Sequence, residues 1–217
     1  MESHIRSDAR PEALRLAALV GIGAVALDLA LRGAWAYTLP RLGLGLAVVL
    51  FQARSFPGGL RGMGFRIQAE PRWSYWPRTG VRLGLAVLGA SLVVALGLWL
   101  VGSLPPLRSG FANAGEALPF LWQGCLWAPI EEELLYRAAL CAPLAVWLGP
   151  RITVLLGGLA FAVLHLAYGN LGPNHLFAGF VLTWAYLRSG NLLVPIALHA
   201  AGNVLVLLLN LILLAVA

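Results

Sequence analysis

The sequence contains no lysine, and only 11% of its 217 residues are charged. Its net charge of +6 therefore comes from arginine alone. The arginines lie between apolar segments and form no single basic face, so the composition gives no support to nucleic-acid binding. With 60% hydrophobic residues and a mean hydropathy of +0.82, the chain has the composition of a polytopic membrane protein. Arginine without lysine, in a chain rich in Ala, Leu and Gly, is typical of a bacterial protein from a GC-rich genome.

Cysteine is scarce as well, since Cys125 and Cys141 are the only two. If one helix joins them, they lie about 24 Å apart at 1.5 Å per residue, which is beyond the reach of a disulfide. The sequence has no H-E-x-x-H motif and no G-x-S-x-G motif. It therefore lacks a zincin-type helix and gives no support to a serine nucleophile. We predict no cleavable signal peptide, because the first apolar run is too long for one.

Long apolar runs predict an all-α fold in a single membrane domain over residues 1–217, with a polar tail over 1–12. We expect about seven membrane spans, or eight if the last segment is divided. The predicted spans are 13–31, 39–53, 83–101, 118–140, 152–166, 175–187 and 192–217. We expect Asp28 to be interfacial and Arg41 to mark a surface loop.

The segment 54–82 combines six arginines with Trp73, Tyr75 and Trp76. Aromatic rings and cations together are typical of the membrane interface, where arginine side chains reach the lipid phosphates. A cytoplasmic N-terminus places most loop arginines in the cytoplasm, as the positive-inside rule requires. These patterns predict a multi-pass protein of the bacterial inner (plasma) membrane.

The stretch A-P-I-E-E-E-L-L-Y-R, residues 128–137, carries three consecutive glutamates inside an apolar run. Each charge at the bilayer centre costs about 2.5–3.5 kcal/mol, so the stretch is a candidate functional site. Residues four apart share a helix face, which pairs Glu133 with Arg137 and places Glu132 beside Tyr136. We expect Glu131 to point elsewhere, toward the helix start. The alternative is a solvated acidic cluster at the membrane surface.

Two later spans carry polar groups in F-A-V-L-H, residues 161–165, and H-A-A-G-N, residues 199–203. Taken singly, His165 or His199 is best explained as a core histidine with a hydrogen-bond partner. Together with Asn203 and the glutamates, the two histidines are expected to form one intramembrane site. His175 is expected to be interfacial.

This set of side chains is suited to hydrolysis. A carboxylate beside an imidazole can take a proton from water and deliver it to a leaving amine. A second histidine and a carboxamide can stabilise the oxyanion of a tetrahedral intermediate. Two imidazoles and a carboxylate could also bind a metal such as zinc. The residues themselves leave both mechanisms open.

The motifs E-E-x-x-x-R (Glu132, Glu133, Arg137), F-x-x-x-H (Phe161, His165) and H-x-x-x-N (His199, Asn203) follow one another on successive spans. In this order they resemble the CPBP family, which comprises CAAX prenyl endopeptidases and bacteriocin-processing or self-immunity proteins. The resemblance covers about residues 118–204, and the first three spans carry no family motif. It implies an α-helical membrane fold with a conical catalytic cavity open to the cytosol and to lipid.

The resemblance also implies a role for each motif residue. Glu132 would activate water, with His165 beside it. His199 and Asn203 would stabilise the oxyanion, and Glu133 and Arg137 would hold the site in place. In a metal-dependent form of the reaction, Glu132, His165 and His199 would be the zinc ligands. Phe161 and Tyr136 would lie at the substrate cavity, while Ala138 stands where the family often has glycine.

We therefore expect an intramembrane endopeptidase that cuts a membrane-anchored or lipidated protein or peptide. Its partners would be this substrate and the bilayer, without nucleic acid. One alternative is a membrane protein of the same fold that serves self-immunity or scaffolding without proteolysis. Another is a proton-coupled transporter, although the sequence shows no internal repeat of the kind many transporters have.

Overall fold

The computed structural model describes residues 11–35, 39–103, 106, 108–169 and 173–216. Most of the predicted polar tail, residues 1–10, lies outside the described residues. Pro11 and Glu12 already belong to the first helix. The described part of the chain is helical and has no strand, which confirms the all-α prediction.

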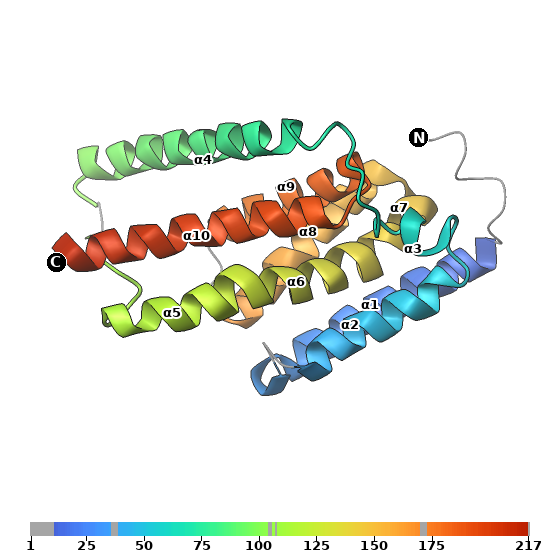
Figure 1. Cartoon of the computed structure of the whole chain (residues 1–217). Coiled ribbons are helices and arrows are strands. Elements are labelled where there is room, and N and C mark those ends of the chain that lie inside the picture. The colour runs from blue at the N-terminus through green and yellow to red at the C-terminus, as the bar shows by residue number, and fades with distance from the viewer. Residues whose placement is uncertain (1–10, 36–38, 104–105, 107, 170–172, 217) are drawn as a thin grey trace.

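The structure is a bundle of helices joined by short loops (Figure 1). Its α-helices are α1 (Pro11–Trp35), α2 (Leu39–Ala53), α3 (Gly59–Gly62), α4 (Tyr75–Leu100), α5 (Ala117–Phe120), α6 (Ala128–Glu133), α7 (Ala142–Leu148), α8 (Pro150–Ala167), α9 (Pro173–Ser189) and α10 (Leu193–Val216). The short 3₁₀ helix η1 (Ala114–Glu116) precedes α5, and η2 (Leu121–Trp127) and η3 (Leu134–Cys141) are π-helical. From α5 to α7 the helical segments follow one another without a break.

Four helices of the described chain are long and apolar enough to cross a membrane: α1, α4, α8 and α10. The shorter α2 is also apolar. The protein is thus an all-α, multi-pass membrane protein, as its composition predicts. The expected number of spans, seven or eight, stays a prediction.

Each predicted span corresponds to a helical segment of the structure. The largest difference between a predicted and an observed boundary is at the start of α4. This helix begins at Tyr75 instead of Leu83. Its first turn is anchored because Trp76 is buried against Trp184 and Val194. Arg78 therefore lies on the helix and not in the loop.

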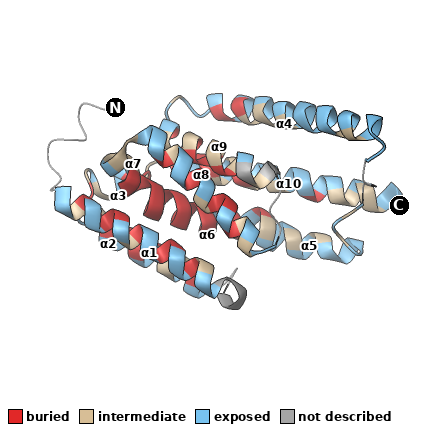
Figure 2. Cartoon of the chain, turned by 180° about the vertical axis from the view of Figure 1, so that it is seen from behind, coloured by how far each residue is buried: buried red, intermediate tan, exposed pale blue. Residues whose placement is uncertain are grey.

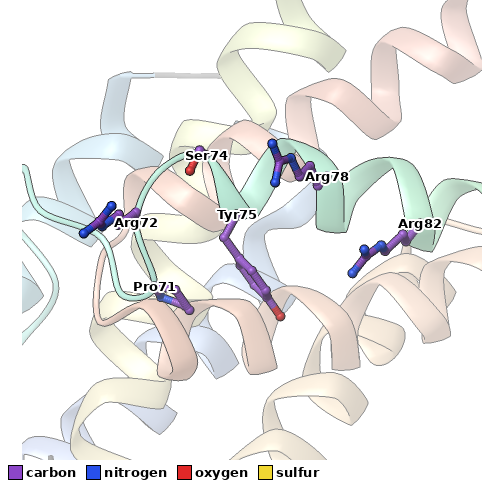
Figure 3. Close-up of a pocket in the computed structure, with 6 residues that line it drawn as sticks. All are labelled: Pro71, Arg72, Ser74, Tyr75, Arg78 and Arg82. Carbon is purple, nitrogen blue, oxygen red and sulfur yellow. The ribbon is translucent and has the colours of Figure 1, made fainter.

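A surface hollow of about 430 Å³ lies at the start of α4 (Figure 3). Its lining residues are Pro71, Arg72, Ser74, Tyr75, Arg78 and Arg82. In Figure 3 the three arginine side chains point in different directions and do not converge on one point. The hollow contains none of the residues of the acidic stretch, and its composition is the interfacial one predicted from the sequence.

Arg66 differs from the other arginines of this segment. Its Nε donates a hydrogen bond to the carbonyl of Gly190 at 2.6 Å, and its Nη2 donates one to the carbonyl of Ser189 at 2.9 Å. These carbonyls lie at the C-terminal end of α9, which a cation stabilises. Arg66 thus joins the 54–82 segment to the turn between α9 and α10, which corrects the expectation that its side chain reaches lipid phosphates.

The centre of the bundle is formed by α6 and η3. Every residue from Glu131 to Leu144 is buried, and α1, α2, α8 and α10 pack around this segment. Figure 2 shows this central segment as the most continuously buried part of the molecule, whereas α4 is exposed along most of its length. The acidic stretch therefore lies in the core, which rules out the alternative of a solvated surface cluster.

Pro143 interrupts the backbone hydrogen bonding of the central helical segment. Pro143 has no N–H to donate to the carbonyl of Ala139, four residues earlier. Gln52 on α2 supplies a donor instead, since its Nε2 lies 2.8 Å from this carbonyl and 2.8 Å from that of Ala17. Neighbouring helices commonly satisfy the backbone groups that proline frees inside membranes. Gln52 thereby connects α1, α2 and η3.

Candidate active site

The predicted pairing of Glu133 with Arg137 is confirmed. Nε of Arg137 lies 2.9 Å from Oε2 of Glu133, and both side chains are fully buried. The guanidinium also lies over the ring of Phe161, 4.8 Å from its centroid, which adds a cation–π contact. The pair connects α6 with η3 and, through Phe161, with α8.

His199 on α10 faces two neighbouring glutamates. Its Nδ1 lies 2.9 Å from Oε1 of Glu133, within hydrogen-bonding distance. Its Nε2 lies 3.9 Å from Oε2 of Glu132. Two of the three motifs, far apart in sequence, therefore meet in one cluster as the sequence predicts.

Exposure differs within this cluster. The side chains of Glu132 and His199 are 10% and 9% exposed, whereas those of Glu133 and Arg137 are 0% exposed. Glu132 and His199 are therefore the less deeply buried members of the cluster. Glu133 and Arg137 lie behind them and support them.

Asn203 lies on the same helix as His199 but makes a different contact. Its Nδ2 donates a hydrogen bond of 2.6 Å to the carbonyl of Gly124 in η2. A π-helix pairs residues five apart, and the residue five positions after Gly124 is Pro129, which has no N–H. Asn203 thus supplies the donor that Pro129 lacks, and the second hydrogen of its amide group is not used in this bond.

His165 is connected to the cluster through aromatic contacts. Its Nδ1 lies 2.9 Å from the carbonyl of Phe161, one turn earlier on α8. The edge of the Phe161 ring meets His199 at a centroid distance of 5.7 Å. His175 stacks on His165 with centroids 4.2 Å apart, and its expected interfacial position stays a prediction. F-x-x-x-H therefore lies next to H-x-x-x-N.

Sequence reasoning missed a second group of charges beside the glutamates. Arg41 in the first turn of α2 forms a bidentate ion pair with Asp28 on α1, with Nε–Oδ1 2.7 Å and Nη2–Oδ2 3.0 Å. Asp28 is fully buried and Arg41 is 2% exposed. Both charges are therefore enclosed within the bundle, and their depth relative to the membrane surface stays a prediction. Two opposite charges in consecutive apolar segments were the available signal, because each requires a partner inside a membrane.

Glu131 belongs to this second group. Its Oε2 accepts a hydrogen bond of 3.0 Å from Nη1 of Arg41, and its Oε1 accepts one of 2.6 Å from Nε1 of Trp127. The bond to Trp127, at the N-terminal end of α6, agrees with the expectation that Glu131 points toward the helix start, and the bond to Arg41 was not expected. Nη1 of Arg41 also lies 4.0 Å from Oε1 of Glu132, which joins the two groups of charges into one cluster.

Tyr136 and Phe161, which the resemblance places at the substrate cavity, are buried in the core. Tyr136 donates a hydrogen bond of 3.2 Å from its hydroxyl to Oδ2 of Asp28. The two rings meet edge to face at a centroid distance of 6.1 Å. They support the charged side chains from within the bundle, and their contact with substrate stays a prediction.

The cluster joins four carboxyl groups (Asp28, Glu131, Glu132 and Glu133) to two guanidinium groups and one imidazole. Charges in a low-dielectric interior must be paired to be tolerated. Asp28, Glu131 and Glu133 each have a partner within 3.0 Å. Glu132 is held more loosely, with its nearest ion-pair partners at 3.9 and 4.0 Å. It is the carboxylate most available for proton transfer.

The zinc hypothesis rests on Glu132, His165 and His199. Across the described parts of the chain, no three or more His, Cys, Asp or Glu side chains are grouped so as to hold a metal ion. These three residues do not form a ligand set in this arrangement, so zinc binding stays a prediction. Both cysteines are buried free thiols, as expected.

The fold and the cluster define a class, that of multi-pass helical membrane proteins with a buried Glu/Arg/His site. Residues 114–205 match the family described as Type II CAAX prenyl endopeptidase Rce1-like. The match spans all three motifs and confirms the resemblance drawn from them.

A curated relative adds a second comparison. The chain is 32% identical over 138 residues to an uncharacterized 24.3 kDa protein of Escherichia coli. The alignment covers 56% of this chain and 62% of that protein, so the chain spans less than two thirds of the relative's length. No solved structure matches the chain.

Proposed function

We propose that this protein is an intramembrane endopeptidase that hydrolyses a peptide bond in a membrane-anchored or lipidated protein or peptide. The observation that carries the proposal is the position of Glu132. It is the least buried carboxylate of the glutamate triplet, its Oε2 faces Nε2 of His199 at 3.9 Å without a hydrogen-bond partner, and no close ion pair holds it. The family match supports the same assignment.

In the proposed reaction, the carboxylate of Glu132 takes a proton from a water molecule while the oxygen attacks the peptide carbonyl. The C–N bond then breaks, and Glu132 delivers the proton to the leaving amine. The distance of 3.9 Å between Glu132 and His199 is too long for a direct hydrogen bond. In the proposed mechanism a water molecule is held beside these two side chains. That water is the proposed nucleophile.

Glu133 orients His199 in this mechanism. A carboxylate 2.9 Å from Nδ1 favours the proton on that nitrogen, which fixes the ring and directs Nε2 toward Glu132. Arg137 in turn holds Glu133. The proposed donors to the oxyanion are His165 and the second amide hydrogen of Asn203, in place of the His199 and Asn203 that the resemblance implies.

The apolar surroundings of the cluster support a substrate held in the membrane. The outer faces of α4 and α10 are apolar and exposed, as expected of surfaces that contact lipid. A peptide bond that reaches Glu132 is therefore expected to belong to a chain held in or at the bilayer. We propose the bacterial inner membrane, with the N-terminus in the cytoplasm, as the location.

The test is cleavage of tail-anchored and lipidated reporter proteins in cells that express the wild type or Glu132→Ala. His165→Ala is tested in parallel, and Ile130→Ala, on the exposed side of α6, is the control for expression and folding. We expect cleavage by the wild type and the control, and none by Glu132→Ala. If Glu132→Ala retains the cellular phenotype of the wild type, a role in self-immunity or scaffolding replaces the protease.

A separate arm addresses zinc. The purified wild type is treated with a chelator and then supplied again with zinc. Loss of cleavage that zinc restores would support ligation by Glu132, His165 and His199. Unchanged cleavage would support water activation by Glu132 alone.

A further inference from the structure

We propose that Arg41, held by Asp28, is a positioning residue for Glu132. This inference rests on the proposed function, and it assigns a role to two helices that carry none of the three motifs. The guanidinium of Arg41 is the point at which three carboxyl groups meet. Nε and Nη2 bind Asp28, while Nη1 binds Glu131 at 3.0 Å and lies 4.0 Å from Glu132.

The contact to Glu131 fixes the rotation of α6. Glu131 is held on one oxygen by Arg41 and on the other by Trp127, so its carboxylate has a single orientation. Glu132 is the next residue on the same helix and points about 100° further round. A rotation of α6 that moved Glu132 away from His199 would break the bond between Glu131 and Arg41, which is the one of these two bonds that leads to another helix.

Asp28 sets the direction in which Arg41 points. The bidentate pair is specific in geometry because both components are planar. Tyr136 adds a hydrogen bond to Oδ2 of Asp28, so the aspartate is held from η3 as well. With Nε and Nη2 occupied by Asp28, only Nη1 is directed at the glutamates.

A purely structural role explains these contacts less well. Burying an arginine with two carboxylates is often no more stabilising than apolar packing of similar volume. The attachment of α1 and α2 to the central helix is already provided by Gln52, which bonds Ala17 and Ala139. The contacts of Arg41 differ from those of Gln52 because they reach Glu131 and Glu132, whereas Gln52 bonds backbone carbonyls.

Gln52 is therefore the matched control. It is 1% exposed, lies on the same helix as Arg41, and contacts the central helix without touching a carboxylate. The experiment compares Arg41→Lys, Asp28→Asn and Gln52→Leu in liposomes, using a reporter that the wild type cleaves. Arg41→Lys keeps the charge but loses the planar fork, and Asp28→Asn keeps the shape but loses the charge.

We expect Arg41→Lys and Asp28→Asn to lower kcat by about tenfold or more while KM stays within about twofold, because a small displacement of a reacting group is costly. The double variant should lose no more than the more severe single variant, since both act through Glu131 and Glu132. Gln52→Leu should lower the unfolding temperature and leave kcat of the folded protein unchanged.

The outcomes separate the two proposals. If the wild type cleaves and Glu132→Gln does not, but Arg41→Lys and Asp28→Asn keep the wild-type kcat, the positioning role is wrong and the protease stands. A lower unfolding temperature with normal kcat in these variants, as in Gln52→Leu, would also overturn it. If Glu132→Gln cleaves like the wild type, the role of Glu132 fails and the positioning role of Arg41 fails with it. If the wild type cleaves no membrane-anchored or lipidated reporter, the proposed function itself fails.

Discussion

Nδ1 of His199 lies 2.9 Å from Oε1 of Glu133, although 66 positions of sequence separate the two residues. The contact joins α10 to α6 at the centre of the bundle. It also leaves Nε2 of the imidazole directed at Glu132, the neighbouring carboxylate. The geometry thus distinguishes two consecutive glutamates, one that holds the histidine and one that is the proposed reacting group.

Replacing His199 should therefore remove activity while the packing of the helices stays largely the same. We expect His199→Ala to reduce cleavage by about 10²-fold, because the imidazole positions the water that Glu132 deprotonates and misplacement of a reacting group is costly. Cleavage of the reporter by the purified variant, with the thermal unfolding temperature as folding control, measures this. A kcat within a factor of about two of the wild type would contradict the role given to the imidazole.

Arg137 is expected to be essential for stability. Removing one partner of a buried ion pair leaves an uncompensated charge and costs about 3–5 kcal/mol. Arg137→Met should therefore lower the stability of the detergent-solubilised protein strongly, as measured by thermal unfolding. Arg61→Gln is the control, because Arg61 is exposed on α3. Equal unfolding temperatures for the two variants would show that Glu133 does not depend on this arginine.

Asn203 has a structural task that is separable from oxyanion binding. Asn203→Ala leaves the Gly124 carbonyl without its donor, which should cost about 1–3 kcal/mol because water is scarce there. Val204→Ala, at an exposed position of the same helix, is the control. Unfolding by heat or by denaturing detergent compares them. A variant that loses activity but keeps full stability would show that the Gly124 contact contributes little to folding.

Much of the fold could be predicted from hydropathy. The prediction for α2, residues 39–53, coincides with the helix, and α8 differs from its predicted span by a residue or two at each end. The start of α4 was placed too late because Arg78 and Arg82 resemble loop residues, whereas the burial of Trp76 extends the helix backward. A hydropathy profile responds to the charged arginines, but it contains no information on the tertiary packing of Trp76 that stabilises the first turn of the helix.

The site was predicted in part. Glu133 with Arg137 follows from the four-residue spacing, and the approach of His199 follows from the cost of leaving polar groups unpaired in a membrane. The pair Asp28–Arg41 was missed because the residues lie on different helices, and no local periodicity relates them. The two π-helical segments were also missed, since a pattern of 3.6 residues per turn was assumed for the whole helix.

The most direct test compares Glu131→Gln, Glu132→Gln and Glu133→Gln in the purified, reconstituted protein. Each substitution keeps the size of the side chain, and the three positions are consecutive. We predict that Glu132→Gln abolishes cleavage and leaves the unfolding temperature unchanged, because Glu132 has the longest ion-pair distances. Glu133→Gln and Glu131→Gln should lower the unfolding temperature, because each loses a bond of 3.0 Å or less. Cleavage by Glu132→Gln at the wild-type rate would contradict the assignment of this carboxylate as the group that activates water.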